Sequence, residues 1–179
     1  MDTKDIIKKI AKVHEATPDE ISAVIKNSEN DGFLFECADK VRREAYGTDV
    51  YIRGLIEFTN YCKNNCFYCG IRRDNRNIKR YRLSIDEIME CCEEGYKLGF
   101  RTFVLQGGED AGFTDDKLCN MISGIKKRYS DCAVTLSMGE RTEESYKRLY
   151  DSGADRYLLR HETASKEHYG MLHPPEMSF

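Results

Sequence analysis

The first fifty residues carry apolar side chains at the spacing of amphipathic helices. The positions that recur in this way at the start of the chain are Ile6, Ile7, Ile10 and Val13. A second helix is predicted to begin at Thr17-Pro-Asp-Glu20, which supplies an N-cap, a proline at the first helical position and a capping glutamate. A third helix is predicted over 33–46, ended by Gly47. Residues 1–49 are therefore expected to form a helical segment.

After position 50 the pattern changes to short apolar runs that alternate with longer amphipathic stretches. The runs predicted as strands are 51–58, 102–105, 133–137 and 155–161. The stretches predicted as helices are 85–98, 115–128, 142–150 and 166–172, the first of them opened by the capping box Ser84-Ile-Asp-Glu87. Four strand–helix units in a row predict an α/β fold with a parallel sheet and right-handed crossovers.

The length of the chain limits how many such units it can hold. A complete barrel of eight strand–helix units takes about 250 residues, so the segment 50–179 has room for about four of them. We therefore expect 50–179 to be the first half of a (βα) barrel of the TIM type, truncated at its C-terminus and preceded by the helical segment.

Three cysteines follow the first predicted strand at a spacing typical of metal ligands. Cys62, Cys66 and Cys69 stand at offsets 0, 4 and 7, so their thiolates can converge on one centre. Iron–sulfur clusters held by cysteine normally take four thiolates. Three thiolates predict a cluster with one open iron, where a small molecule can bind.

A structural zinc site and disulfides are the alternatives for these thiols. Such a zinc site needs four protein ligands, and the nearest spare thiols, Cys91 and Cys92, fall inside a predicted helix. The N-terminus has charges from its second residue and no signal peptide, which indicates a cytoplasmic protein with reduced thiols. No apolar run is long enough to span a membrane, and the net charge of −3 argues against a nucleic-acid binder.

Polar residues and glycines cluster where the predicted strands end, which is where ligands bind in parallel α/β folds. Gly107 and Gly108, followed by Glu109, would let the backbone approach a ligand closely, or would simply mark a strand-to-helix turn. Strand alternation puts Thr135 with Ser137 on one face, and Arg160 with Glu162 on one face of the last strand. The latter two would bind a polar ligand or form a structural ion pair. The histidines, which receive no catalytic role, are His14, His161, His168 and His173.

The cysteine motif, with an aromatic residue before its last cysteine, resembles that of radical S-adenosylmethionine (SAM) enzymes. Within that superfamily, the stretches that resemble the HydE family of FeFe-hydrogenase maturases are 69–82, 104–110, 134–140 and 153–164. Methylornithine synthases share much of this pattern, and biotin synthases share less. The resemblance runs from about Tyr51 to the last residue.

This resemblance implies a [4Fe-4S] cluster on Cys62, Cys66 and Cys69, with SAM bound at its open iron. It implies reductive cleavage of SAM to methionine and a 5′-deoxyadenosyl radical, for maturation of the hydrogenase active-site cluster. The residues that it places against SAM are Tyr68, Gly107, Gly108, Glu109, Ser137 and Glu162. Thr135 and Arg160 would face the substrate.

The implied partners are a small-molecule or iron-complex substrate, a low-potential electron donor of the ferredoxin or flavodoxin type, and other hydrogenase maturases. Two alternatives stay open. One is a mutase similar to methylornithine synthase, which acts on lysine, and the other is an inactive fragment that binds a cluster without turnover. The family pattern continues beyond Phe179 to an arginine for the SAM carboxylate, which this chain does not reach.

Overall fold

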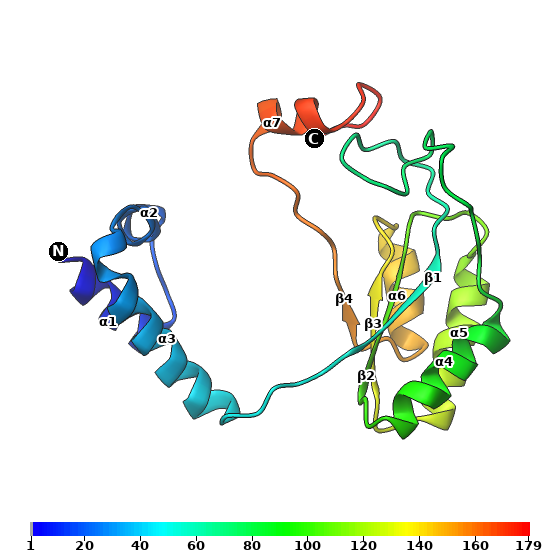
Figure 1. The fold of residues 1–179 in the computed structure, drawn as a ribbon, viewed down its shortest axis with the longest axis horizontal. Coiled ribbons are helices and arrows are strands. Elements are labelled where there is room, and N and C mark those ends of the chain that lie inside the picture. Colours follow the sequence, from blue (N-terminus) through cyan, green and yellow to red (C-terminus); the bar gives the residue numbers. More distant parts are fainter. Residues whose placement is uncertain (1) are drawn as a thin grey trace. The chain divides into compact units, whose positions relative to one another are not determined.

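The chain divides into two compact units, one ending at Tyr51 and one running from Ile52 to Phe179. The computed structural model describes residues 2–179 (Figure 1). No helix in this part of the chain combines the length and the apolar character that crossing a membrane requires.

The N-terminal unit is helical, as predicted. Its elements are α1 (Thr3–Val13), α2 (Pro18–Lys26), the short 3-10 helix η1 (Ser28–Asn30) and α3 (Asp31–Tyr46). The capping box is confirmed, because Thr17 accepts from the Glu20 backbone while the Glu20 side chain accepts from the Thr17 backbone. An ion pair of 2.7 Å between Lys9 and Glu20 ties α1 to α2. Gly47 ends α3 with a φ of 67°, which glycine adopts readily.

The second unit has a parallel sheet of four strands in the order β1-β2-β3-β4, which confirms the predicted α/β fold. The strands are β1 (Gly54–Thr59), β2 (Thr102–Gly107), β3 (Ala133–Ser137) and β4 (Arg156–Tyr157). The helices that follow them in turn are α4 (Ile85–Lys97), α5 (Asp115–Arg128), α6 (Glu143–Asp151) and α7 (Lys166–Leu172). The chain therefore contains the four predicted strand–helix units (Figure 1).

Two predicted strand boundaries were wrong. The first strand begins at Gly54 and not at 51, because Gly54 pairs with Phe103 at the start of β2 and the residues before it have no partner strand. The last strand covers two residues instead of 155–161. Its neighbour β3 stops at Ser137, and the last ladder bond joins the Leu158 N–H to the Leu136 carbonyl at 2.8 Å. Residues 159–162 therefore lie beyond the sheet.

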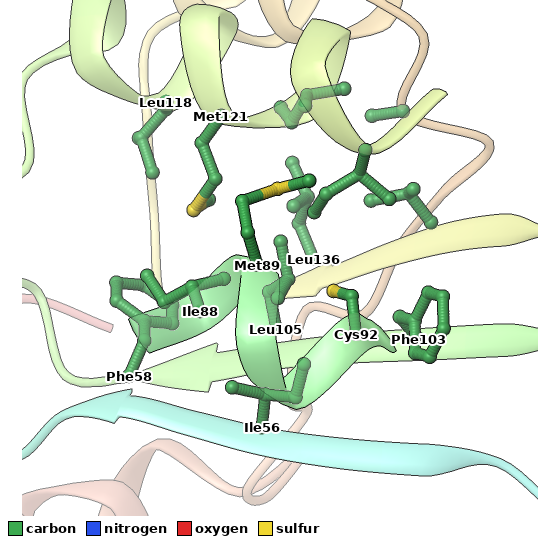
Figure 2. Close-up of a cluster of buried hydrophobic side chains, with 14 of the residues drawn as sticks. Ile56, Phe58, Ile88, Met89, Cys92, Phe103, Leu105, Leu118, Met121 and Leu136 are labelled. Atoms are coloured by element: carbon green, nitrogen blue, oxygen red, sulfur yellow. The ribbon is translucent and has the colours of Figure 1, made fainter. Parts of the chain in front are cut away.

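The hydrophobic core lies between the sheet and helices α4, α5 and α6. Strand alternation sends one set of side chains toward these helices. The strand residues of this helix face are Ile56, Phe58, Phe103, Leu105, Val134 and Leu136, and they pack against Ile88, Cys92, Leu118 and Met121 among others (Figure 2). The intervening residues form the opposite face of the sheet, which consists of Leu55, Glu57, Val104, Gln106, Thr135 and Ser137.

Candidate functional site

The three cysteines of the motif lie on the loop that leaves the carboxyl end of β1. Cys62, Cys66 and Cys69 are half-buried, and all three are free thiols, as are the other five cysteines of the chain. A turn bond of 3.0 Å joins the Cys69 N–H to the Cys66 carbonyl, and the Asn64 N–H points at the Cys62 sulfur at 3.4 Å. The loop thus presents three unpaired thiols without a disulfide between any two of them.

Electrostatics show that these thiols share one neighbourhood. Burial raises the pKa of the Cys66 thiol, the Tyr68 hydroxyl lowers it, and the nearby thiols of Cys62 and Cys69 raise it further. Because metals bind the thiolate, a metal that bound Cys66 would have to displace a proton from a thiol that holds it more tightly than usual.

The arrangement differs from a site for a single metal ion. Within residues 2–179, no three histidine, cysteine or carboxylate side chains lie close enough together to hold one ion. A cubane iron–sulfur cluster binds each cysteine through a different iron, so its ligands stand further apart than those of one ion. Three half-buried thiols on one loop fit the soft ligand set of such a cluster.

The start of the cysteine loop is held against β2 by a buried carboxylate. Asp110 accepts from both the Nε (2.6 Å) and Nη2 (2.7 Å) atoms of Arg82, from the Thr59 hydroxyl (2.7 Å) and from the Gly112 N–H (2.8 Å). Burial raises the pKa of Asp110, but these hydrogen bonds outweigh it and leave the pKa below its ordinary value. The Arg82 guanidinium in turn lies 3.8 Å from the centre of the Tyr61 ring.

The glycine pair at the end of β2 is needed for packing against the cysteine loop. A Cβ atom at Gly108 would overlap the Tyr61 carbonyl oxygen and lie 2.6 Å from the Cys62 Cβ, and one at Gly107 would lie 2.6 Å from the Thr59 Cγ2. Side chains at either position would therefore push the loop away. We predicted that these glycines make room for a ligand, and the structure gives them this second reason to be small.

Glu109 is already surrounded by protein donors. Its carboxylate accepts from the Lys63 ammonium at 2.8 Å, from the Asn64 amide at 2.8 Å and from the Glu140 N–H at 3.3 Å. Glu109 thus joins the cysteine loop to the segment that follows β3. Direct contact of its side chain with a ligand would require these bonds to be replaced.

The opposite face of the sheet carries a buried hydroxyl without a partner. Thr135 and Ser137 are 4% and 5% exposed, and the Thr135 Oγ1 makes no hydrogen bond to any described residue. Leaving a buried hydroxyl unpaired costs about 1–3 kcal/mol, so this atom fits a site that a polar ligand completes.

Arg160 lies at the edge of this face, where it bonds Gln106, which in turn bonds Glu57; sequence reasoning missed both of these residues. Its Nη2 donates to the Gln106 side-chain oxygen at 3.2 Å, and the Gln106 amide donates to the Glu57 carboxylate at 3.1 Å. Strand alternation could have found Gln106 and Glu57, since their neighbours in sequence are core residues. The predicted pairing of Arg160 with Glu162 on one strand face is wrong, because neither residue lies on β4.

Glu162 lies instead near Tyr68 of the cysteine loop. Burial raises the pKa of Tyr68, and the charges of Cys66 and Glu162 raise it further, so the phenol keeps its proton. The Tyr68 hydroxyl also faces the Nε2 atom of His173 at 3.4 Å. Sequence reasoning gave His173 no role, and nothing in its local pattern indicates this long-range contact.

His173 is only 4% exposed and lies stacked against the Tyr169 ring at 3.9 Å. Its Nδ1 lies 3.0 Å from the Tyr169 carbonyl, which can only accept, so Nδ1 carries a proton and donates it to this carbonyl. A second bond, from the Phe67 N–H to the Leu172 carbonyl at 2.9 Å, ties the end of α7 to the loop. The segment after β4 therefore packs on the cysteine motif.

Comparison with known proteins places this arrangement in a family. The model of the Radical SAM superfamily matches residues 56–177. The maturase subunit HydE of FeFe-hydrogenase from Thermotoga maritima is 48% identical over 141 residues, which are 79% of this chain and 40% of that protein. The resemblance inferred from the cysteine motif and its flanks is thereby confirmed.

Solved structures agree with this result. The crystal structure of methylornithine synthase (PylB) superposes with a TM-score of 0.82 at 26% identity, over 96% of this chain and 52% of that one. The maturase HydG of FeFe-hydrogenase gives a TM-score of 0.81 at 30% identity, over 96% of this chain and 40% of that one. The chain thus spans about half or less of the length of the relatives it matches. On its sequence and on its fold, it belongs to the Radical SAM superfamily of enzymes.

Proposed function

We propose that Cys62, Cys66 and Cys69 hold a [4Fe-4S] cluster and that the protein uses it to cleave SAM. The observation that carries this proposal is the set of three free, half-buried thiols on one loop beyond the carboxyl end of β1, in a chain of the Radical SAM superfamily. When bound, the cluster supplies the electron that splits SAM into methionine and a 5′-deoxyadenosyl radical.

The residues of this chain would then bind and orient the cofactor. Around the cluster we assign SAM contacts to Tyr68, Gly107, Gly108, Glu109, Ser137 and Glu162. Support comes from the nearness of Glu162 to Tyr68, whose pKa it raises, and from the close packing of Gly108 on the loop. Glu162 is exposed and can accept from a cationic amino group, and Tyr68 lies near it on the cysteine loop.

Thr135 and Arg160 are assigned to the substrate. The Thr135 hydroxyl has no protein partner among the described residues, so it is free to bond a polar ligand. Arg160 bonds the neutral amide of Gln106, which leaves its positive charge without a neutralising carboxylate in direct contact. A substrate with an anionic group would supply that missing charge.

The biological task that we infer is maturation of the FeFe-hydrogenase active-site cluster, on a small-molecule or iron-complex substrate. The 48% identity to HydE supports it. A low-potential donor of the ferredoxin or flavodoxin type would supply the electron, and other maturases would act with it. The likeness to methylornithine synthase favours a second candidate, a carbon-skeleton mutase.

Anaerobic reconstitution tests the ligand assignment. The wild-type chain should take up about four irons and four sulfides, and Cys66→Ala should lose most of them. Cys91→Ala is the matched control, since Cys91 is an exposed thiol on α4, and it should keep a full cluster. A full cluster in Cys66→Ala would refute the assignment.

An assay for 5′-deoxyadenosine on the reconstituted protein separates the remaining candidates. Formation of this product supports the enzyme. A cluster that binds without SAM cleavage supports the inactive fragment instead. Lysine as the only substrate that couples to cleavage would favour the mutase over the maturase.

A further inference from the structure

Arg80 stands out among the basic residues of the cysteine loop because its guanidinium bonds backbone carbonyls at both ends of that loop. Nη1 donates to the Asn60 carbonyl, before the first cysteine, and to the Ile71 carbonyl at 2.9 Å, after the last one. Nη2 donates to the carbonyls of Arg72 at 2.6 Å and Asn75 at 3.2 Å. A single side chain therefore joins the two ends of the loop.

The backbone on either side of Arg80 is fixed by further hydrogen bonds. The Asn60 side chain donates to the Lys79 carbonyl at 2.8 Å and accepts from the Tyr81 N–H at 2.8 Å. Arg80 thus stands between two residues that are already fixed to Asn60, which holds its guanidinium in place. The carbonyls it bonds belong to irregular backbone, where no helix or sheet ladder supplies a donor.

Charge alone does not explain this arrangement. The loop from 60 to 82 has seven basic residues and one acidic residue, Asp74; the basic ones are Lys63, Arg72, Arg73, Arg76, Lys79, Arg80 and Arg82. Arg76 and Lys79 are exposed to solvent, whereas Arg80 is partly buried. Several carbonyls at fixed positions require a planar fork of donors, which arginine has and lysine lacks.

We propose that Arg80 is a positioning residue that gives the cysteine loop its shape before a cluster enters. It contacts neither the thiols nor the cofactor in this role. By ordering the loop during folding, it removes a conformational cost that cluster binding would otherwise meet. The proposal rests on the assignment of Cys62, Cys66 and Cys69 as cluster ligands.

The test uses the full chain with Arg80→Lys, which keeps the charge and loses the fork. Arg76→Lys is the matched control, an exposed arginine in the same loop. In the metal-free protein, hydrogen exchange should speed up about tenfold at the loop amides of Cys69 and Arg73, which bond the carbonyls of Cys66 and Asn64. Exchange in β2 should stay unchanged, and so should all exchange in the control.

The second readout is the loss of iron from the reconstituted proteins to a chelator. We expect Arg80→Lys to lose its cluster about tenfold faster than wild type and Arg76→Lys to match wild type. Equal behaviour of the two variants in both readouts would overturn the proposal, as would equal acceleration of exchange in β2. If wild type binds no cluster, the proposed function fails, and the exchange readout still decides the role of Arg80.

Discussion

The two faces of the sheet differ in how completely the protein itself supplies contacts for the side chains that they bury. On the helix face, Phe103, Leu105, Val134 and Leu136 are at most 1% exposed and pack against apolar side chains. On the opposite face, the neighbours of these residues in sequence include Thr135, whose buried hydroxyl has no partner within residues 2–179.

This difference separates stability from binding. Burial of apolar area on the helix face stabilises the fold, and the tight packing there leaves no polar group to be satisfied. The buried hydroxyl of Thr135 costs stability, and the exposed Arg160, bonded to an amide, adds little, so neither is explained by the stability of the fold. Both are consistent with the ligand site proposed above. Three experiments can break or sharpen this comparison.

The largest effect should follow removal of a side chain from the helix face. Leu105→Ala should lower the free energy of unfolding by about 2–5 kcal/mol, because it opens a cavity in a fully packed core. Val104→Ala, at the preceding residue and on the opposite face, should cost about 1 kcal/mol or less. Urea unfolding followed by circular dichroism measures both. Equal losses would show that the opposite face is packed as a second core.

Substitution of two buried threonines should change the free energy of unfolding by smaller amounts and in opposite directions. Thr59→Val removes a buried hydrogen bond of 2.7 Å to the Asp110 carboxylate and should cost about 1.5–3 kcal/mol. Thr135→Val removes an unpaired hydroxyl and should raise the stability of the ligand-free protein by about 1 kcal/mol. The same unfolding measurement applies. A loss of stability in Thr135→Val would mean that its hydroxyl is already satisfied.

The smallest effect should come from the edge of the opposite face. Arg160 is exposed and bonds one amide, so Arg160→Gln should change the unfolding free energy by less than about 0.5 kcal/mol. A loss above about 1 kcal/mol would assign Arg160 to the structure of the sheet and remove the argument that it is kept for a substrate.

Most of the fold could be predicted because local patterns determine it. The N-caps at Thr17 and Ser84, each paired with a glutamate three residues on, place two helix starts correctly. The last strand could not be bounded in this way, since its length depends on where β3 stops. That end follows from the tertiary path of the chain and not from the apolar run at 155–161.

The site shows the same limit. Cys62, Cys66 and Cys69 come from one short motif, so their shared loop could be read from the sequence alone. The contact of His173 with Tyr68 joins residues far apart in the sequence, and the hydrogen bonds of Arg80 to the loop depend on its side-chain conformation. The periodicity of the sequence encodes neither. The assignments to SAM and substrate stay predictions until the variants are measured.

The glycine at 108 also sets an order of events in time. A Cβ atom does not fit at Gly108 beside Tyr61 and Cys62, so the cysteine loop packs closely on a segment that comes after the whole of α4 and β2. During synthesis the three thiols emerge first, with nothing yet to press against. A cluster bound as proposed above would therefore meet a finished loop only after β2 has docked beside β1.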